Sequence, residues 1–379
     1  MKKAALLLFF GVLCLSACRK DVNPETPIKD ASLTGTSVDV SAISRKTGKL
    51  FVLNEGQMGT NGASLDFLRF DDGTYVTGAF KKMNPDVGAG LGDVGNDIAV
   101  KGDEAWIVVN NSGLVEVISA TNERESAPIT IPSPRFIAFD DTYAYVTSYA
   151  GAYINYDGKW NITDSSNPKG KVYRINIHNR EVNGSVEVGY QPEGIAVYGG
   201  KLYVANSGGF SSSLAPDYAY DKTVSVIDAA TFKVTKTLTL TDNLQRVYSD
   251  GNGNIYVTSF GIYGKVPSSI WRINAGDGDK VSKIADNVSV SAISGDTVYW
   301  IGSEDGTWKG NTCRNGVKGS FSINLDGVNP YGLAVLDKDV MFVSDAGDYV
   351  NPGTVNMFVG GTKKWSVTAG ICPGHFAIY

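Results

Sequence analysis

The sequence predicts an all-β protein, a seven-bladed β-propeller that is closed by pairing of its C-terminal strand with the first blade. A two-strand unit recurs along the chain, and a seventh copy of that unit is divided between the two ends. No long segment shows the spacing of apolar residues that is typical of a helix. Together these observations indicate a ring of repeated sheets.

The recurring unit is a short apolar strand, a tight polar turn and a second strand with an aromatic residue near its start. The clearest copy is residues 192–197 (PEGIAV), followed by 201–204 (KLYV). Similar copies begin at Pro134, Pro330 and Asn96, and weaker ones begin near Leu244 and Val288. A small alanine lies in the middle of the first strand, as expected where innermost strands crowd around a narrow axis.

The seventh copy is split. Residues 373–379 (PGHFAIY) form a first strand with no second strand after it, and residues 49–53 (KLFVL) form a second strand with no first. Pairing these two segments closes the ring and removes exposed sheet edges. The 331 residues from 49 to 379 give about 47 per blade, within the ~40–50 expected of a four-stranded blade.

The first residues resemble an export signal. Lys2 and Lys3 precede an apolar run at 4–13, and the segment ends in Ser16-Ala17-Cys18, the lipobox pattern of bacterial lipoproteins. The alternative is an ordinary signal peptide beside a chance cysteine. We therefore expect a lipoprotein signal peptide at 1–17, a lipidated Cys18 with a flexible tether at 18–48, and the propeller at 49–379. The tether is predicted from its many Pro, Ser, Thr and Asp residues.

Charge and cysteine content narrow the function classes. Removing residues 1–17 leaves 32 basic against 39 acidic residues, a net charge of about −7. A nucleic-acid partner requires a strongly basic face, so none is expected. Cys313 and Cys372 remain in an oxidising compartment and are a candidate disulfide. Two free thiols remain the alternative, because one blade separates the two cysteines.

Strand alternation divides the loops between two faces. Turns between first and second strands are short and lie on one face, here called the turn face. Loops between second and third strands, and links between blades, lie on the other, the loop face, and hold insertions at 148–170, 207–221, 259–268, 303–316 and 344–353. These insertions carry aromatic residues that either pack on each other or contact a ligand: Tyr149, Tyr153, Trp160, Phe210, Phe260, Trp308 and Tyr349.

The innermost strands begin on the same loop face, around the mouth of the central channel. The residues at these starts combine both charges with amide and aromatic groups: Asn96, Asp97, Arg135, Glu193, Arg246, Tyr331 and His375. Such a mixture suits a polar ligand with several functional groups. The alternative is a self-neutralising ring around water.

Motifs of catalysis and metal binding are not found in the sequence. It has no Cys/His cluster with zinc spacing, no Gly-x-Ser-x-Gly elbow, no P-loop and no dinucleotide-binding fingerprint. We therefore expect no catalytic residue, no metal and no catalytic cofactor, and a protein that binds rather than an enzyme.

The blade pattern Pro-x-Gly-Ile-Ala-Val, Lys-Leu-Tyr-Val-Ala-Asn and Val-Ser-Val-Ile-Asp resembles the YncE/YVTN-type seven-bladed propellers over nearly all of 49–379. With the lipobox and the large loops, the chain resembles the BtuG-type surface lipoproteins of gut Bacteroidetes. That resemblance implies a lipid-anchored protein of the outer membrane that faces the cell exterior. It also implies that the protein binds cobalamin or another corrinoid as a ligand and passes it to a TonB-dependent outer-membrane transporter. A glycan- or protein-binding surface propeller is the alternative.

The residues are compatible with a corrinoid. The loop aromatics would cover the apolar faces of the ring, Asn and Gln would meet its edge amides, and Arg135 or Arg246 would meet the phosphate.

Overall fold

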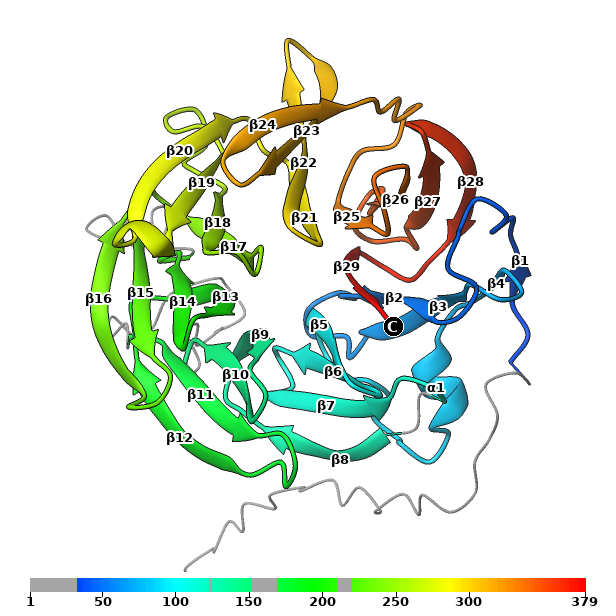
Figure 1. Cartoon of the computed structure of the whole chain (residues 1–379). Helices are drawn as coiled ribbons and strands as arrows, with labels where there is room; N and C mark the ends of the chain where they lie inside the picture. Colours follow the sequence, from blue (N-terminus) through cyan, green and yellow to red (C-terminus); the bar gives the residue numbers. More distant parts are fainter. Residues whose placement is uncertain (1–32, 123–124, 151–168, 210–219) are drawn as a thin grey trace, which may run out of the picture.

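Seven sheets surround a central channel in the computed structural model of the chain, which describes residues 33–122, 125–150, 169–209 and 220–379 (Figure 1). Six sheets have four antiparallel strands and one has five. This confirms the predicted all-β, seven-bladed propeller. Within the described ranges, no helix is long and apolar enough to cross a membrane. Among the described residues, the helical elements are α1 (Ala79–Met83) and the short 3-10 turn η2 (Ala275–Asp277).

Blades 2 to 7 each consist of four strands that are consecutive in the chain, the first strand lying next to the channel. Blades 2 to 4 contain β5 (Gly95–Lys101), β6 (Glu104–Val109), β7 (Leu114–Ser119), β8 (Glu125–Thr130), β9 (Pro134–Phe139), β10 (Tyr143–Ser148), β11 (Lys171–Asn176), β12 (Val182–Glu187), β13 (Pro192–Tyr198), β14 (Lys201–Asn206), β15 (Thr223–Asp228) and β16 (Lys233–Thr239). Blades 5 to 7 contain β17 (Leu244–Ser249), β18 (Asn254–Ser259), β19 (Ser269–Asn274), β20 (Lys280–Asp286), β21 (Val290–Ser294), β22 (Thr297–Glu304), β23 (Thr307–Arg314), β24 (Val317–Phe321), β25 (Gly332–Val335), β26 (Val340–Asp345), β27 (Thr354–Val359) and β28 (Thr362–Thr368).

Blade 1 joins the two ends of the chain. Its innermost strand is the last one, β29 (Pro373–Ile378), and β2 (Lys49–Asn54), β3 (Ser64–Arg69), β4 (Thr74–Val76) and β1 (Thr36–Ser37) follow outward. In the β2–β29 pairing, Phe51 lies opposite Ala377 and Leu53 lies opposite His375. The predicted closure by the C-terminal strand is therefore confirmed.

Residues 33–48 belong to the folded domain, although the sequence placed them in the flexible tether at 18–48. Strand β1 pairs with β4, and the Asp39 carbonyl accepts a hydrogen bond of 2.8 Å from Trp365 Nε1. Ile43 is fully buried in the core between blades 1 and 7. The segment has few apolar residues, but Leu33, Val38 and Val40 also pack against the blade cores. The remaining residues of the expected signal and tether lie outside the described residues.

A single pairing rule governs the channel wall. In six blades a small alanine of the innermost strand lies directly opposite a large aromatic side chain of the second strand, so that the aromatic ring fills the space away from the crowded axis. The pairs are Ala99–Trp106, Ala138–Tyr145, Ala196–Tyr203, Ala292–Tyr299, Ala334–Phe342 and Ala377–Phe51. Blade 5 differs, because Tyr248 takes the alanine position opposite Tyr256.

The prediction of an insertion at 303–316 is wrong. This segment is the end of β22, a tight turn and β23. Asp305 and Gly306 both have positive φ angles, 50° and 74°, as a two-residue hairpin turn requires. The Asp-Gly pair that signals such a hairpin is present in the sequence. Trp308 therefore lies on a strand and packs, half-buried, against the core shared by blades 6 and 7.

The candidate disulfide between Cys313 and Cys372 is also wrong, since both cysteines are free and buried. Cys313 lies in β23 opposite Val298, close to the turn face, rather than in a loop of the loop face. Cys372 lies in the link that enters β29 on the loop face. The two thiols therefore belong to opposite ends of their blades.

The closed ring predicts a strong dependence on the last strand. Deleting residues 371–379 would leave β2 and the innermost walls of the neighbouring blades open to water. We expect the truncated chain to aggregate, or to melt at a much lower temperature than the full-length chain, in differential scanning calorimetry. A soluble truncation with a cooperative transition near that of the full-length chain would contradict closure through β29.

Candidate functional site

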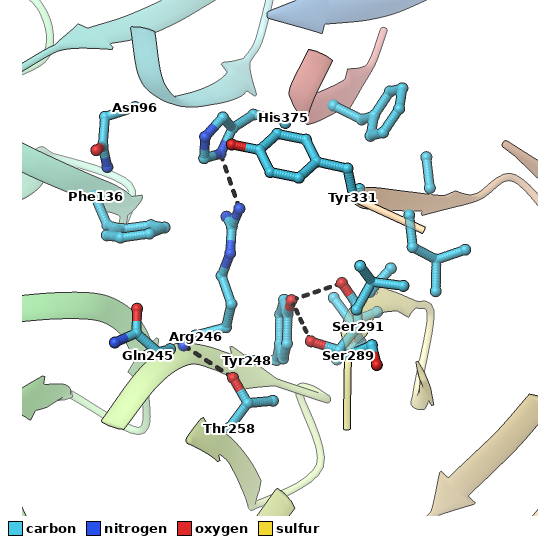
Figure 2. Close-up of a pocket in the computed structure, with 18 of the residues that line it drawn as sticks. Asn96, Phe136, Gln245, Arg246, Tyr248, Thr258, Ser289, Ser291, Tyr331 and His375 are labelled. Carbon is cyan, nitrogen blue, oxygen red and sulfur yellow. Dashed lines mark hydrogen bonds between the residues drawn. The ribbon is translucent and has the colours of Figure 1, made fainter. Parts of the chain in front are cut away.

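The candidate site is a cavity of about 600 Å³ in the central channel. This lies within the ~300–1,000 Å³ usual for small-molecule pockets. Its wall is formed mainly by the innermost strands β17, β21, β25 and β29 (Figure 2), with one residue from β5, two from β9 and two from β18. Glu55, Arg135, Arg246 and His375 make the end nearest the loop face charged and polar. Residues of β21, β25 and β29, such as Ile293 and Val335, make the deeper wall apolar.

Tyr248 lies on the cavity wall where blade 5 meets blade 6. Its ring occupies the position that holds alanine in the other six blades, and its hydroxyl donates to the Ser291 carbonyl at 2.9 Å. The larger side chain keeps β17 and β21 apart, and these are the least closely packed neighbours among the innermost strands. Figure 2 shows Tyr248 beside Ser291 at the edge of the open space.

Arg135, Glu193 and Tyr149 form a closed cluster at the mouth. Arg135 Nε and Nη2 both lie 2.9 Å from Glu193 Oε2, and the Tyr149 hydroxyl donates to Glu193 Oε1. The Tyr149 ring lies 4.9 Å from the Arg135 guanidinium carbon. Burial alone would lower the pKa of Arg135, but the Glu193 charge, the Tyr149 phenol, the Glu193 hydrogen bond and the Glu55 charge together raise it. Both charges of this pair are therefore satisfied inside the protein.

A second cluster connects Arg246, His375, Glu55 and Tyr331 across the channel. Arginine can only donate, so His375 Nδ1 accepts from Arg246 Nη2 at 2.8 Å. The ring proton is then on Nε2, which donates to Glu55 Oε1 at 3.2 Å. The Tyr331 hydroxyl also bonds to Glu55. The network holds the imidazole of His375 in a single tautomer, and Figure 2 shows its bond with Arg246.

The ionisation of this cluster follows from burial and charge. Burial, and then the Arg246 charge, lower the pKa of His375. Burial would raise the pKa of Glu55, but the hydrogen bonds from His375 and Tyr331 and the Arg135 charge together lower it. Burial, the Glu55 charge and the hydrogen bond between Tyr331 and Glu55 raise the pKa of Tyr331 well above its usual value. At neutral pH the cluster therefore holds a guanidinium, a neutral imidazole, a carboxylate and a neutral phenol.

Asn96 and Asp97 have mainly a structural role at the mouth. Asn96 Nδ2 donates to the Arg135 carbonyl at 2.6 Å, and the Ile137 amide donates to Asp97 Oδ2 at 3.0 Å. These bonds join blade 2 to blade 3. Asp97 Oδ1 also lies 3.6 Å from Arg246 Nη1, and burial raises the pKa of this carboxyl.

The structure brings together only some of the expected loop aromatics. Phe260 lines the cavity and is 61% exposed, and the Tyr349 ring meets the Tyr331 ring edge-on at 5.6 Å. Trp308 does not reach the cavity, because it packs between blades. Tyr153, Trp160 and Phe210 lie outside the described residues.

Several lining residues were missed from the sequence. The predicted mouth residues were those at the starts of the innermost strands. Glu55 was not among them because it follows a second strand. Gln245 lies beside a selected position, and Phe136 resembles an ordinary core residue. Tyr248 could have been found by aligning the copies and noting the missing alanine.

The histidine network predicts an unusual titration. Burial and the Arg246 charge disfavour imidazolium at His375, and Glu55 and Asp97 only partly oppose them. Its NMR titration should give a pKa below 6.5, and Arg246→Gln should raise that pKa. Because the unfolded chain takes up this proton more readily, His375 should stabilise the fold above about pH 6.5, and this stability should be lost as the pH falls towards the lower folded pKa. A pKa at or above 6.5 would contradict the buried network.

Comparisons with known proteins support the fold alone. No family model and no curated protein matches the chain. Among solved structures, it is similar to hydrazine synthase of Kuenenia stuttgartiensis, with a TM-score of 0.54, 15% identity and coverage of 75% of this chain and 89% of that one. It is also similar to a functionally unknown protein from Desulfotomaculum acetoxidans, with a TM-score of 0.57, 13% identity and coverage of 88% of this chain and 99% of that one. Apo AztD from Citrobacter koseri has a TM-score of 0.50 and 11% identity, with coverage of 88% of this chain and 98% of that one. At these identities the similarity shows the propeller architecture alone and does not identify a ligand.

Proposed function

We propose that this protein is a surface lipoprotein that captures a small ligand at the mouth of its propeller channel. The observation that carries the proposal is the open cavity of about 600 Å³, with charged and polar groups gathered at the end nearest the loop face. A propeller whose channel served only structure would gain nothing from burying Arg135, Glu193, Arg246 and Glu55 there, because buried charges cost free energy even when they are paired.

The proposed ligand is cobalamin or a related corrinoid, which the protein passes to a TonB-dependent outer-membrane transporter. The support is the likeness of the blade motifs and lipobox to BtuG-type lipoproteins. The mouth adds polar groups for the amide edge of a corrinoid, and the rim adds Phe260, Tyr263 and Tyr349, which are at least half exposed. These exposed aromatics equally favour the second candidate, a glycan-binding surface propeller, because aromatic rings also stack on sugars.

We propose binding rather than catalysis at this site. His375 is the only histidine at the mouth, and both of its ring nitrogens already have hydrogen-bond partners. Neither nitrogen is free to take a proton from a ligand, as a general base must do.

Isothermal titration calorimetry with cyanocobalamin tests the ligand. We expect one molecule to bind per chain, and Arg246→Gln to weaken binding by about 1–3 kcal/mol, the usual loss for a hydrogen bond from a charged group. The matched control is Arg314→Gln, because Arg314 is 70% exposed and lies at the turn-face end of β23. Absence of heat at micromolar cyanocobalamin would end the corrinoid proposal and favour the glycan alternative.

The anchor has a separate test. Cys18→Ser removes the thiol that would carry the lipid, while leaving the described domain unchanged. We expect the protein to move from the detergent phase to the aqueous phase in Triton X-114 partition, with an unchanged melting temperature. An unchanged partition would exclude lipidation at this residue.

A further inference from the structure

Two charged side chains at the mouth keep hydrogen-bonding capacity that the described residues do not use. Arg246 has five N–H donors, of which one meets His375, and its contact with Asp97 at 3.6 Å is beyond hydrogen-bonding distance. Glu55 has about four acceptor sites, of which His375 and Tyr331 occupy two. Both residues line the cavity, and their side chains are 31% and 27% exposed. The mouth therefore offers a donor and an acceptor on the two sides of one imidazole.

The other guanidinium at the mouth is not available in this way. Both Arg135 nitrogens that face Glu193 lie at 2.9 Å from one oxygen, and Tyr149 covers the guanidinium. Glu193 is also closed, with its side chain only 4% exposed. The Arg246 and Glu55 pair is therefore the part of the mouth that can bind a new group.

The charge balance disfavours an anion at this position. Arg135 and Arg246 face the carboxylates of Glu55, Asp97 and Glu193, and His375 is neutral, so the mouth carries one net negative charge. An incoming carboxylate would gain Arg246 but would also lie beside Glu55 and Asp97. A cation would meet the most exposed charge of the mouth, Arg246, which repels it. A neutral group that both accepts and donates hydrogen bonds avoids both costs.

The surrounding rings favour a flat group. The Arg246 guanidinium lies over the Phe136 ring at 4.8 Å from its centre, and Tyr331 lies across the cavity from it (Figure 2). Below these residues the wall is apolar, with Ile293, Val335 and other residues of β21 and β25. A planar polar head joined to an apolar body would match both parts.

We infer that the Arg246–Glu55 pair recognises a primary carboxamide of the ligand, with the amide oxygen accepting from Arg246 and the amide N–H donating to Glu55. This inference rests on the proposed ligand site and names its chemistry. It assigns Arg246 to an amide, whereas the sequence alone left it as a candidate partner of a phosphate.

The chain provides its own reporter for a test that needs no corrinoid. It has only two histidines, and His178 is exposed in a turn between β11 and β12 while His375 lies between the two proposed contacts. We would titrate the chain from residue 19, free of any tag, with benzamide, benzoate and cis-1,2-cyclohexanediol, and follow both imidazoles by NMR. Benzamide should shift the His375 signals saturably and leave those of His178 in place, whereas benzoate and the diol should bind at least tenfold more weakly.

A charge variant sharpens the comparison. Glu55→Gln removes the carboxylate that repels benzoate, so the preference for benzamide over benzoate should fall about tenfold. Glu187→Gln is the matched control, because Glu187 is 62% exposed and pairs only with Lys169 among the described residues. Its preference should equal that of the unaltered chain.

Three results would overturn the inference, and all can be read from the unaltered chain even if Glu55→Gln fails to fold. Stronger binding of benzoate would make the mouth an anion site, and stronger binding of the diol would make it a sugar site. No shift of His375 with any probe would exclude a carboxamide site there. Failure of cyanocobalamin to bind is a separate outcome, and concerns only the proposed corrinoid.

Discussion

Crowding at the propeller axis is the constraint on which the rest of the structure depends. Seven innermost strands converge on one channel, and six of them solve the problem by placing alanine directly opposite a large aromatic ring of the second strand. The rings fill the widening space between blades, where close packing stabilises the fold most. The seventh strand carries Tyr248 instead, and the ring opens beside it. A local departure from the packing rule thus produces the cavity that the proposed function uses.

The polar mouth follows a second rule, that buried charges are retained only with partners. Arg135 and Glu193 satisfy each other almost completely, and this pair bridges blades 3 and 4. Arg246 and Glu55 instead share a neutral histidine, which holds both in place without neutralising either. The first arrangement leaves no uncompensated charge where blades 3 and 4 meet. The second leaves the charged groups oriented and partly open, which is the arrangement that binding a polar group requires.

The sequence was sufficient to predict the ring because the same pattern of residues recurs along the chain. Each copy has the same alternation of residues in the same register. The starts of the innermost strands, such as Arg135, Arg246 and His375, can therefore be assigned to the mouth from the sequence alone. The errors fall where no repeat helps. Residues 33–48 are polar on average, yet Ile43 is fully buried by blades that are distant in sequence. Glu55 reaches the site only because ring closure brings β2 against β29. The Asp305-Gly306 turn was instead interpreted as part of a long insertion, although Asp-Gly is typical of a hairpin.

Closure through β29 also fixes the order in which the molecule can be completed. His375 and Glu55 are 320 residues apart, and they meet only when the last strand of the chain is in place. Such distant pairing makes folding slow compared with local contacts. A chain that emerges from its amino terminus therefore has no finished ring, and no finished ligand mouth, until β29 is free to pair. The strand that completes the architecture is also the strand that delivers His375, so folding and binding competence arise in the same step.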